Sequence, residues 1–299
     1  MTFTPRGALR GVGIESVESG VDWITFVEKD PLGRLALVEL GESLVRQEAS
    51  AGAKVTGFHA EGYHGWKASR VSIGSRPDSS LLRISGGAAA MHWGSLRGFT
   101  GRPSRLDVQT SIKLTSERKD FGSLIMSRLK SHRRQATGRP LKVTIWRDSE
   151  GSFCGMVGSR TSRKYLRVYD KGVEGQTHAA GRFWRIELEA KRDLSGELWS
   201  QLKSTPAPSE WCLKCCESSA RQSGLRWPLE PSSELPVLPP APRPEPPEIE
   251  RTKRWLRSMV APAITRLVGA VDTGELLELL SLDGYAIPLN RAPRMERRA

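Results

Sequence analysis

Three segments of this chain alternate between polar and apolar residues, and this alternation constrains the fold more than any other feature. The segments are RLDVQ at 105–109, YLRVYDK at 165–171 and RIELEAK at 185–191. Successive side chains of a β-strand point to opposite faces, so each segment predicts a strand with one polar and one apolar face. Strands of this kind are typical of an antiparallel sheet with one packed and one solvated face.

The rest of the chain extends this prediction to an α+β fold, a mainly antiparallel sheet with packed helices. Residues 1–95 are predicted to be rich in strands, and residues 105–114 form a clear one. Apolar spacing predicts an amphipathic helix at 116–135. A short helix is predicted after residue 192, with Asp193 as its N-cap. Further strands are expected at 21–30, 70–87 (two strands around a turn), 141–148 and 151–160.

Composition suggests the domain boundaries. The parts 1–95 and 96–227 are expected to form one main domain. Prolines crowd residues 228–248, which excludes a regular helix or a central strand and favours an extended or flexible linker. Residues 249–299 are predicted to be a small C-terminal helical unit, packed on the main body or on a second copy of the chain.

The charge balance indicates a polyanionic partner. The 299 residues include 46 Lys and Arg against 33 Asp and Glu, a net charge of +13. Such an excess favours nucleic acid as the partner, with an ordinary basic soluble protein as the alternative. We expect a cytoplasmic location and no membrane partner, because there is no apolar leader and no apolar run of 18 residues.

Four cysteines are too few for a disulfide scaffold in a chain of this length. Three of them form the cluster Cys212, Cys215 and Cys216. A structural zinc site needs four ligands, and no histidine lies near this cluster in the sequence. A partly buried, reduced thiol cluster is therefore the favoured prediction.

If the three alternating strands are neighbours, their polar faces combine groups suited to phosphate chemistry. Carboxylates bind Mg²⁺ through oxygen, arginines bind phosphate oxygens, and a tyrosine can form a covalent intermediate. Lys171 lies two residues beyond Tyr169 on the predicted strand and could help to lower the pKa of the tyrosine. The alternative is a set of cross-strand Arg–Glu pairs and aromatic residues that only stabilise the sheet. The polar set is Arg105, Asp107, Tyr165, Arg167, Tyr169, Arg185, Glu187 and Glu189.

The stretch GMVGSRTSRKYLRVYDKGVE (155–174), followed by RFWRIELEAK (182–191), resembles the replication initiation factor family. These are rolling-circle replication initiators of plasmids and filamentous phages, related to relaxases of integrative elements. The segments SRLDV (104–108) and RWLRSMVAPAITRL (254–267) are similar to family sequences as well. The resemblance implies a nicking domain over residues 1–227 and an endonuclease that nicks one DNA strand at an origin hairpin through a 5′-phosphotyrosine, with Mg²⁺ or Mn²⁺.

The resemblance also implies roles for individual residues. Tyr169 would be the nucleophile, assisted by Lys171, and Tyr165 would contact DNA. The implied metal ligands are Asp107, Glu187 and Glu189. The implied phosphate contacts are Arg160, Arg167, Lys171 and Arg185. Candidates for origin recognition are the C-terminal unit and the basic residues of helix 116–135, namely Lys119, Arg128, Lys130, Arg133 and Arg134.

The sequence departs from the family at two points that bear on the metal. Gln109, Thr110 and Ser111 stand where the family often has a second acidic residue. The five histidines are dispersed, which argues against nickases whose metal sits on a His-hydrophobic-His pair. The chain lacks a P-loop motif, so a host helicase and polymerase are expected as partners. The alternatives are a conjugative relaxase with the same chemistry and a non-catalytic DNA-binding regulator on the same fold.

Overall fold

The computed structural model describes residues 11–127, 142–147, 153–175, 180–236, 238, 252–253 and 255. The chain divides into two compact units, Met1–Pro240 and Ala241–Ala299. Only three residues of the second unit are described, so the predicted C-terminal helical unit lies outside the described residues.

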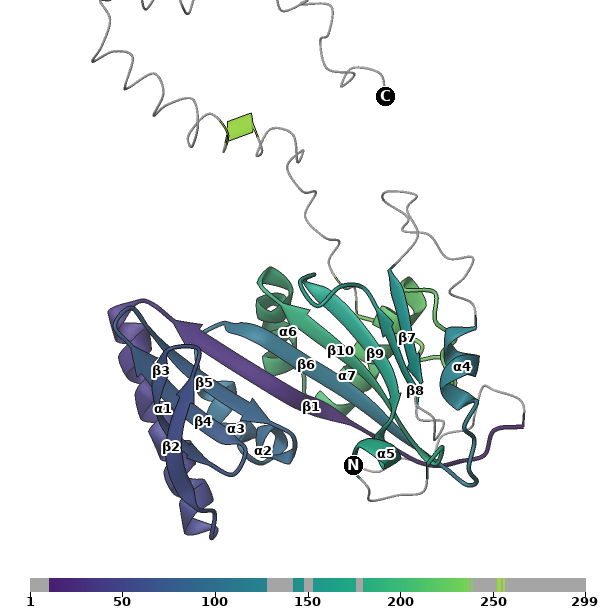
Figure 1. The fold of residues 1–299 in the computed structure, drawn as a ribbon, viewed down its shortest axis with the longest axis horizontal. Coiled ribbons are helices and arrows are strands. Elements are labelled where there is room, and N and C mark those ends of the chain that lie inside the picture. The colour runs from purple at the N-terminus through teal and green to yellow at the C-terminus, as the bar shows by residue number, and fades with distance from the viewer. Residues whose placement is uncertain are drawn as a thin grey trace, which may run out of the picture. The chain divides into compact units, whose positions relative to one another are not determined.

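The first unit is built on one antiparallel sheet, whose ten strands lie in the order β2-β3-β4-β5-β1-β6-β10-β9-β8-β7 (Figure 1). This confirms the predicted α+β class. The strands are β1 (Ile14–Glu28), β2 (Val55–Ala60), β3 (Tyr63–Ala68), β4 (Val71–Arg76), β5 (Ser79–Ser85), β6 (Pro103–Leu114), β7 (Val143–Arg147), β8 (Phe153–Val157), β9 (Lys164–Asp170) and β10 (Phe183–Lys191).

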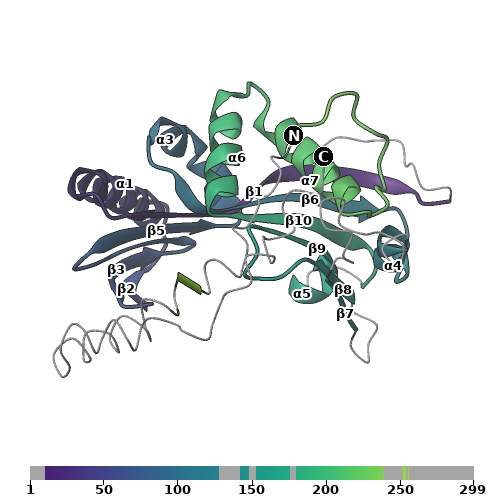
Figure 2. The ribbon, with the colours of Figure 1, turned by 90° about the horizontal axis from the view of Figure 1, so that it is seen from above.

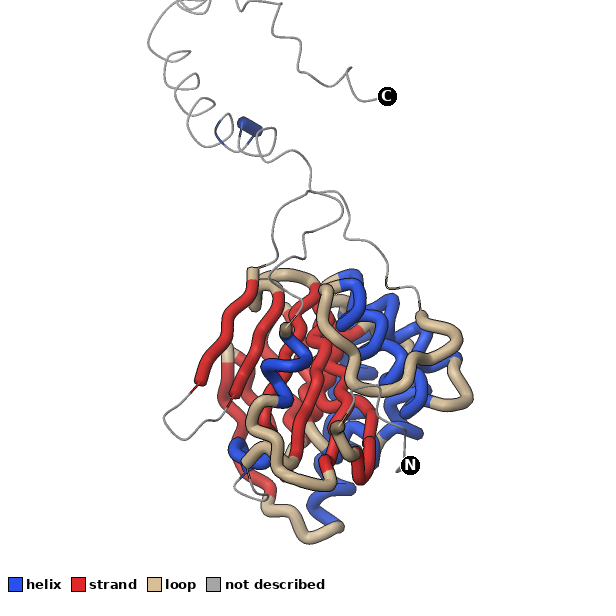
Figure 3. The backbone as a smooth tube through the Cα atoms, turned by 90° about the vertical axis from the view of Figure 1, so that its right-hand side faces the viewer, coloured by secondary structure: helices blue, strands red, loops and turns tan. Residues whose placement is uncertain are grey.

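Helices cover one face of this sheet. Figures 2 and 3 show most of them on one side of the strands, and α1, α6 and α7 contact β4, β6, β10 and β1. The apolar strand residues on this side, among them Leu106, Val108 and Leu188, are fully buried in the main core. The helices are α1 (Pro31–Ser50), α2 (Gly87–Met91), α3 (Trp93–Gly98), α4 (Phe121–Met126), α5 (Lys171–Gly175), α6 (Asp193–Ser204) and α7 (Pro208–Gln222).

Residues 1–95 hold five of the strands, as predicted, but they also hold helix α1, which was not predicted. It runs for 20 residues between β1 and β2 and buries Leu37 and Leu44 against the sheet. Its start is marked in the sequence, because the Asp30 carboxylate accepts a hydrogen bond from the Gly33 amide at 3.0 Å and Pro31 occupies the first turn. A capping residue followed by proline is a typical helix start.

The start of α6 corrects a prediction. Asp193 is the first residue of the helix, and the N-cap position belongs to Arg192, which has a left-handed φ of +60°. Strand β10 runs on to Lys191, so the sharp turn falls one residue earlier than predicted. Asp193 instead forms an ion pair with Arg163, and its charge still favours the helix N-terminus.

The cysteine cluster lies on α7 and belongs to the core. Cys212, Cys215 and Cys216 are fully buried, and the Cys216 thiol donates to the Val108 carbonyl at 3.5 Å. Burial raises the pKa of Cys216 to about 12, and it also raises the pKa values of Cys212 and Cys215. These thiols are therefore protonated packing groups that bind α7 to the centre of the sheet.

The described start of the proline-rich segment is fixed to the main body. Leu229 is buried, and the buried Glu217 carboxylate of α7 accepts hydrogen bonds from the Ser232 amide at 3.1 Å and its hydroxyl at 2.7 Å. Residues 228–236 therefore close the core beside α7. No helix within the described ranges is both long and apolar enough to cross a membrane.

Gly41 tests the packing of α1 on the sheet. A Cβ at this position would lie 2.6 Å from Ile73 of β4, so Gly41→Ala overpacks a buried contact. We expect it to lower the free energy of unfolding by about 1–3 kcal/mol, measured by urea denaturation.

Gly94 in α3 is the matched control, because a Cβ there would meet no atom within 4 Å. Gly94→Ala should leave stability unchanged or raise it by up to about 1 kcal/mol. Equal effects of the two substitutions would contradict the close packing of α1 on β4.

Candidate active site on the polar face of the sheet

The three alternating segments are adjacent strands, so the condition for a shared polar face is met. Strand β10 lies between β6 and β9, and both pairings are antiparallel. Residues directly opposite each other share a face. Three rows therefore cross one face: Ser111–Arg185–Tyr169, Gln109–Glu187–Arg167 and Asp107–Glu189–Tyr165. This confirms that the predicted carboxylates and tyrosines lie together on a single polar face.

The three carboxylates on this face are buried, although α1, α6 and α7 cover the other face of the sheet. Asp107 and Glu187 are 1% exposed and Glu189 is 6% exposed. A buried charge is costly unless it is paired and hydrogen-bonded. Their burial therefore requires cations from neighbouring strands.

Three cationic side chains supply this pairing. Arg105 donates hydrogen bonds to both carboxylate oxygens of Asp107, and its Nη2 lies 3.0 Å from Oε2 of Glu189. Lys191 pairs with the other oxygen of Glu189. We call these residues, together with Arg167 and Glu187, the charge network; three carboxylates face three cations within it.

Tyr169 is joined to the charge network through Glu187. Its hydroxyl donates to Glu187 Oε2 at 3.0 Å, while Arg167 pairs with Oε1 of the same carboxylate. The Arg167 guanidinium also lies 5.7 Å from the centre of the Tyr169 ring. Tyr165 is buried on the same face, in the row of Asp107. The structure thus places a proton acceptor at the hydroxyl of the tyrosine that the resemblance identifies as the nucleophile.

Lys171 is not in the strand, which corrects the prediction that it continues the polar face. Strand β9 ends at Asp170, whose buried carboxylate accepts hydrogen bonds from the amides of Gly172, at 3.0 Å, and Gly181. These bonds turn the chain into α5, of which Lys171 is the first residue. Its Nζ nevertheless lies 5.9 Å from the centre of the Tyr169 ring.

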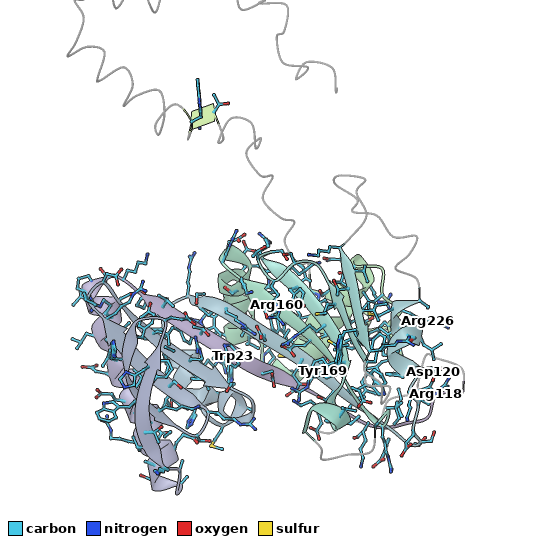
Figure 4. All side chains as sticks on the ribbon, in the orientation of Figure 1. Trp23, Arg118, Asp120, Arg160, Tyr169 and Arg226 are labelled. Atoms are coloured by element: carbon cyan, nitrogen blue, oxygen red, sulfur yellow. The ribbon has the colours of Figure 1, made fainter. Side chains whose placement is uncertain are left out.

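Residues 158–162, with the sequence Gly-Ser-Arg-Thr-Ser, lie in the turn between β8 and β9. Gly158 has φ +100°, and the Ser162 hydroxyl donates to the Lys164 carbonyl at 2.7 Å. The turn presents an exposed Arg160. Arg160 precedes β9 and Tyr169 lies near its other end, so the two are separated by the length of the strand (Figure 4). Arg160 is therefore not placed beside Tyr169, and its phosphate role stays a prediction.

Arg185 lies directly opposite Tyr169 but is held by other partners. Its Nη1 donates to Asp22 Oδ1 at 2.9 Å, and its Nε donates to the Ser111 hydroxyl at 3.1 Å. Asp22 lies where the pairing of β1 with β6 shifts register between Val21 and Trp23. This irregularity directs Asp22 toward Arg185, and strand alternation could not have predicted it.

The sequence places Arg105 on the polar face but predicts no role for it, and Lys191 is not among the predicted site residues. Both lie two residues from a predicted carboxylate, so the period of two places them on the polar face. Each contacts a carboxylate two residues away on its own strand, and the register of β6 with β10 adds the contact of Arg105 with Glu189. Four predicted DNA contacts, Arg128, Lys130, Arg133 and Arg134, lie outside the described residues.

The three carboxylates predicted to bind a metal ion are not arranged as a metal site. Each of Asp107, Glu187 and Glu189 is bound to Arg or Lys. In the part of the chain that the structure describes, no three His, Cys, Asp or Glu side chains converge to hold a metal ion. The metal role of these residues stays a prediction.

Comparisons with known proteins do not assign this chain to a family. No protein-family model matches the chain, and no curated protein matches it. Among solved structures it is similar to a rolling circle replication initiator protein from Geobacillus stearothermophilus. The identity is 15% and the TM-score 0.45, over 62% of this chain and 79% of the other.

Asp107 predicts a pH dependence of stability. Burial, together with the nearby Glu187 and Glu189, raises its pKa to about 7, although Arg105 acts in the opposite direction. In the unfolded chain the pKa is near the ordinary value of 3.8. The folded protein thus binds more protons between pH 4 and 7. Asp107 therefore contributes most to stability below pH 4, and this contribution is lost as pH rises through 7.

Asp107→Asn should remove this dependence. We expect the unfolding free energy of the unmodified chain to fall by a few kcal/mol from pH 5 to pH 8, and the fall to be clearly smaller in the variant. Urea denaturation at both pH values measures the difference. An equal fall in both proteins would show that Asp107 ionises normally in the folded state.

Proposed function

We propose that this chain nicks and rejoins one strand of DNA by transesterification, with Tyr169 as the nucleophile. The observation that carries the proposal is the hydrogen bond from the Tyr169 hydroxyl to Glu187 on the polar face of the sheet. Arg167, Arg185 and Lys171 surround this pair. A nucleophile, its proton acceptor and cations for a phosphate are thus together.

In the proposed reaction, Glu187 takes the proton of the Tyr169 hydroxyl as the tyrosine attacks. An ordinary tyrosine has a pKa near 10 and is a weak nucleophile at neutral pH, so a base at hydrogen-bond distance is needed. The phenolic oxygen forms a bond to phosphorus, and the bond from phosphorus to the 3′ oxygen breaks. The 3′ oxygen takes up a proton from solvent. The reverse reaction rejoins the strand without ATP.

The cations would stabilise the charge that develops on the phosphate. Arg167 and Arg185 flank Tyr169 and can each present several N–H donors to phosphate oxygens. Both hold protein carboxylates in the structure. Binding of DNA would therefore replace some of these ion pairs with contacts from the arginines to phosphate oxygens. Positioning of the phosphate and stabilisation of its charge supply much of the catalysis in phosphate transfer.

Mg²⁺ or Mn²⁺ remains part of the proposal as a cofactor. A divalent ion, when bound, neutralises phosphate charge and orients the group. Asp107 and Glu189, the two predicted ligands that are not the proton acceptor, would hold it, but both contact Arg105 in this arrangement. Comparing nicking in EDTA with nicking in added Mg²⁺ or Mn²⁺ tests this requirement.

The biological role proposed for this chemistry is initiation of rolling-circle DNA replication. The net charge of +13 supports DNA as the substrate. Specificity for one origin and assistance from a host helicase and polymerase belong to the same proposal. A conjugative relaxase would use identical chemistry on a transfer origin. A regulator that only binds DNA would not cut it, so an assay for DNA nicking distinguishes this alternative from the other two.

Tyr169→Phe should abolish covalent capture of DNA. The substitution removes the attacking oxygen and leaves the ring in place. The assay incubates the chain and Mn²⁺ with a pool of single-stranded oligonucleotides of randomised sequence. Covalent adducts that survive denaturation are then recovered, and sequencing of the captured strands identifies the preferred site.

Tyr165→Phe is the matched control and should still form the adduct. If Tyr165→Phe alone abolishes it, the two tyrosines exchange roles. If Tyr169→Phe cuts DNA as well as the unmodified chain, the assignment of Tyr169 as the nucleophile is wrong. If the unmodified chain forms no adduct under any metal condition, while binding DNA, the binding-only alternative holds.

Glu187→Gln tests the proton acceptor. The amide keeps the shape of the side chain but is a far weaker base, so we expect the nicking rate to fall by roughly 10²–10⁴-fold. Raising the pH should restore part of the rate, because hydroxide then replaces the missing base. A loss of rate that does not change with pH would indicate that Glu187 only positions Arg167.

A further inference from the structure

Trp146 is an exposed aromatic residue on the same face of the sheet as Tyr169. It lies on the edge strand β7 directly opposite Cys154 of β8, and Cys154 lies directly opposite Tyr169 of β9. Opposite residues share a face, so the three form one row. With strands about 4.8 Å apart, Trp146 lies about 10 Å from Tyr169 across the sheet.

The setting of Trp146 differs from that of an ordinary exposed apolar residue. Its side chain is 54% exposed, and only the half-buried Cys154 stands between it and Tyr169 in the row. Beyond Tyr169 the row continues to Arg185, and Arg167 lies in the next row. The face thus presents an indole at one edge and guanidinium groups further in. Sites for single-stranded nucleic acid combine aromatic platforms with cations along the backbone path.

We propose that Trp146 stacks against a base of the single-stranded DNA whose neighbouring phosphate Tyr169 attacks. This inference rests on the proposed function and names a substrate contact of the same site. The DNA strand would run across the β-strands, from the cations over β10 and β9 to the edge strand β7. Stacking accepts any base, so Trp146 holds the strand in place without reading its sequence.

Trp66 provides a matched comparison on the opposite face. It is 55% exposed, close to the value for Trp146. It lies opposite Ile73, which lies opposite Leu82, and both are buried in the core on the helix side. Trp66 therefore shares residue type and exposure with Trp146 but lies on the face without Tyr169.

The test measures binding of a fluorescent oligo-dT to the full chain by anisotropy. Every protein carries Tyr169→Phe, which prevents covalent capture. We expect Trp146→Ala to bind about tenfold more weakly and Trp146→Phe to recover most of the affinity. Trp66→Ala should bind as the parent does. An oligonucleotide of equal length with abasic sites throughout should bind the parent and Trp146→Ala equally, because it has no base to stack.

Several results would overturn the proposal. One is equal affinity of Trp146→Ala and the parent for oligo-dT. Another is an equal loss for the abasic strand, which would indicate a general defect; circular dichroism checks folding. A third is a change in oligomeric state on size exclusion with unchanged DNA affinity, which would assign Trp146 to contact with a second copy. If these results occur while the chain with intact Tyr169 still nicks DNA, the proposed function stands without this contact. If the parent binds no single-stranded DNA, both fail.

Discussion

The buried charge network on the polar face is the interaction on which the site depends. Asp107, Glu187 and Glu189 would be costly to bury alone, and each is balanced by Arg105, Arg167 or Lys191 from the same or a neighbouring strand. Removing one partner of a buried pair costs about 3–5 kcal/mol, because the other charge remains uncompensated. The ion pairs between strands therefore stabilise the register of β6, β10 and β9, and that register in turn brings the paired charges together.

The opposite face of the same strands makes this arrangement rigid. Leu106, Val108 and Leu188 alternate with the charged residues and are fully buried under α6 and α7. A slip of one residue in the pairing would turn carboxylates into the core and leucines to the polar side. The hydrophobic core thus protects the pairing of Tyr169 with Glu187 against such a slip. The protonated thiols of α7 contribute to this packing without chemistry of their own.

Most of the sheet was predictable from sequence, and the errors have local causes. Asp30 and Pro31 mark the start of helix α1 in the sequence, whereas the alternating segments around it predict strands. Lys171 was placed on a strand because the alternation continues past Asp170. Hydrogen bonds from the Gly172 and Gly181 amides to the Asp170 carboxylate end the strand there. Asp193 was displaced from the cap position because Arg192 makes the turn instead.

The sequence by itself determined which side chains share a face within each strand, because a period of two is a local property of extended backbone. It therefore placed the carboxylates and tyrosines of β6, β9 and β10 on polar faces. Only the tertiary structure decided which strands are neighbours and in which register. Those choices bring Arg105 to Glu189, join the Tyr169 hydroxyl to Glu187, and direct Asp22 toward Arg185. Such pairings join residues far apart in the chain and depend on how the whole sheet packs, so no local pattern specifies them.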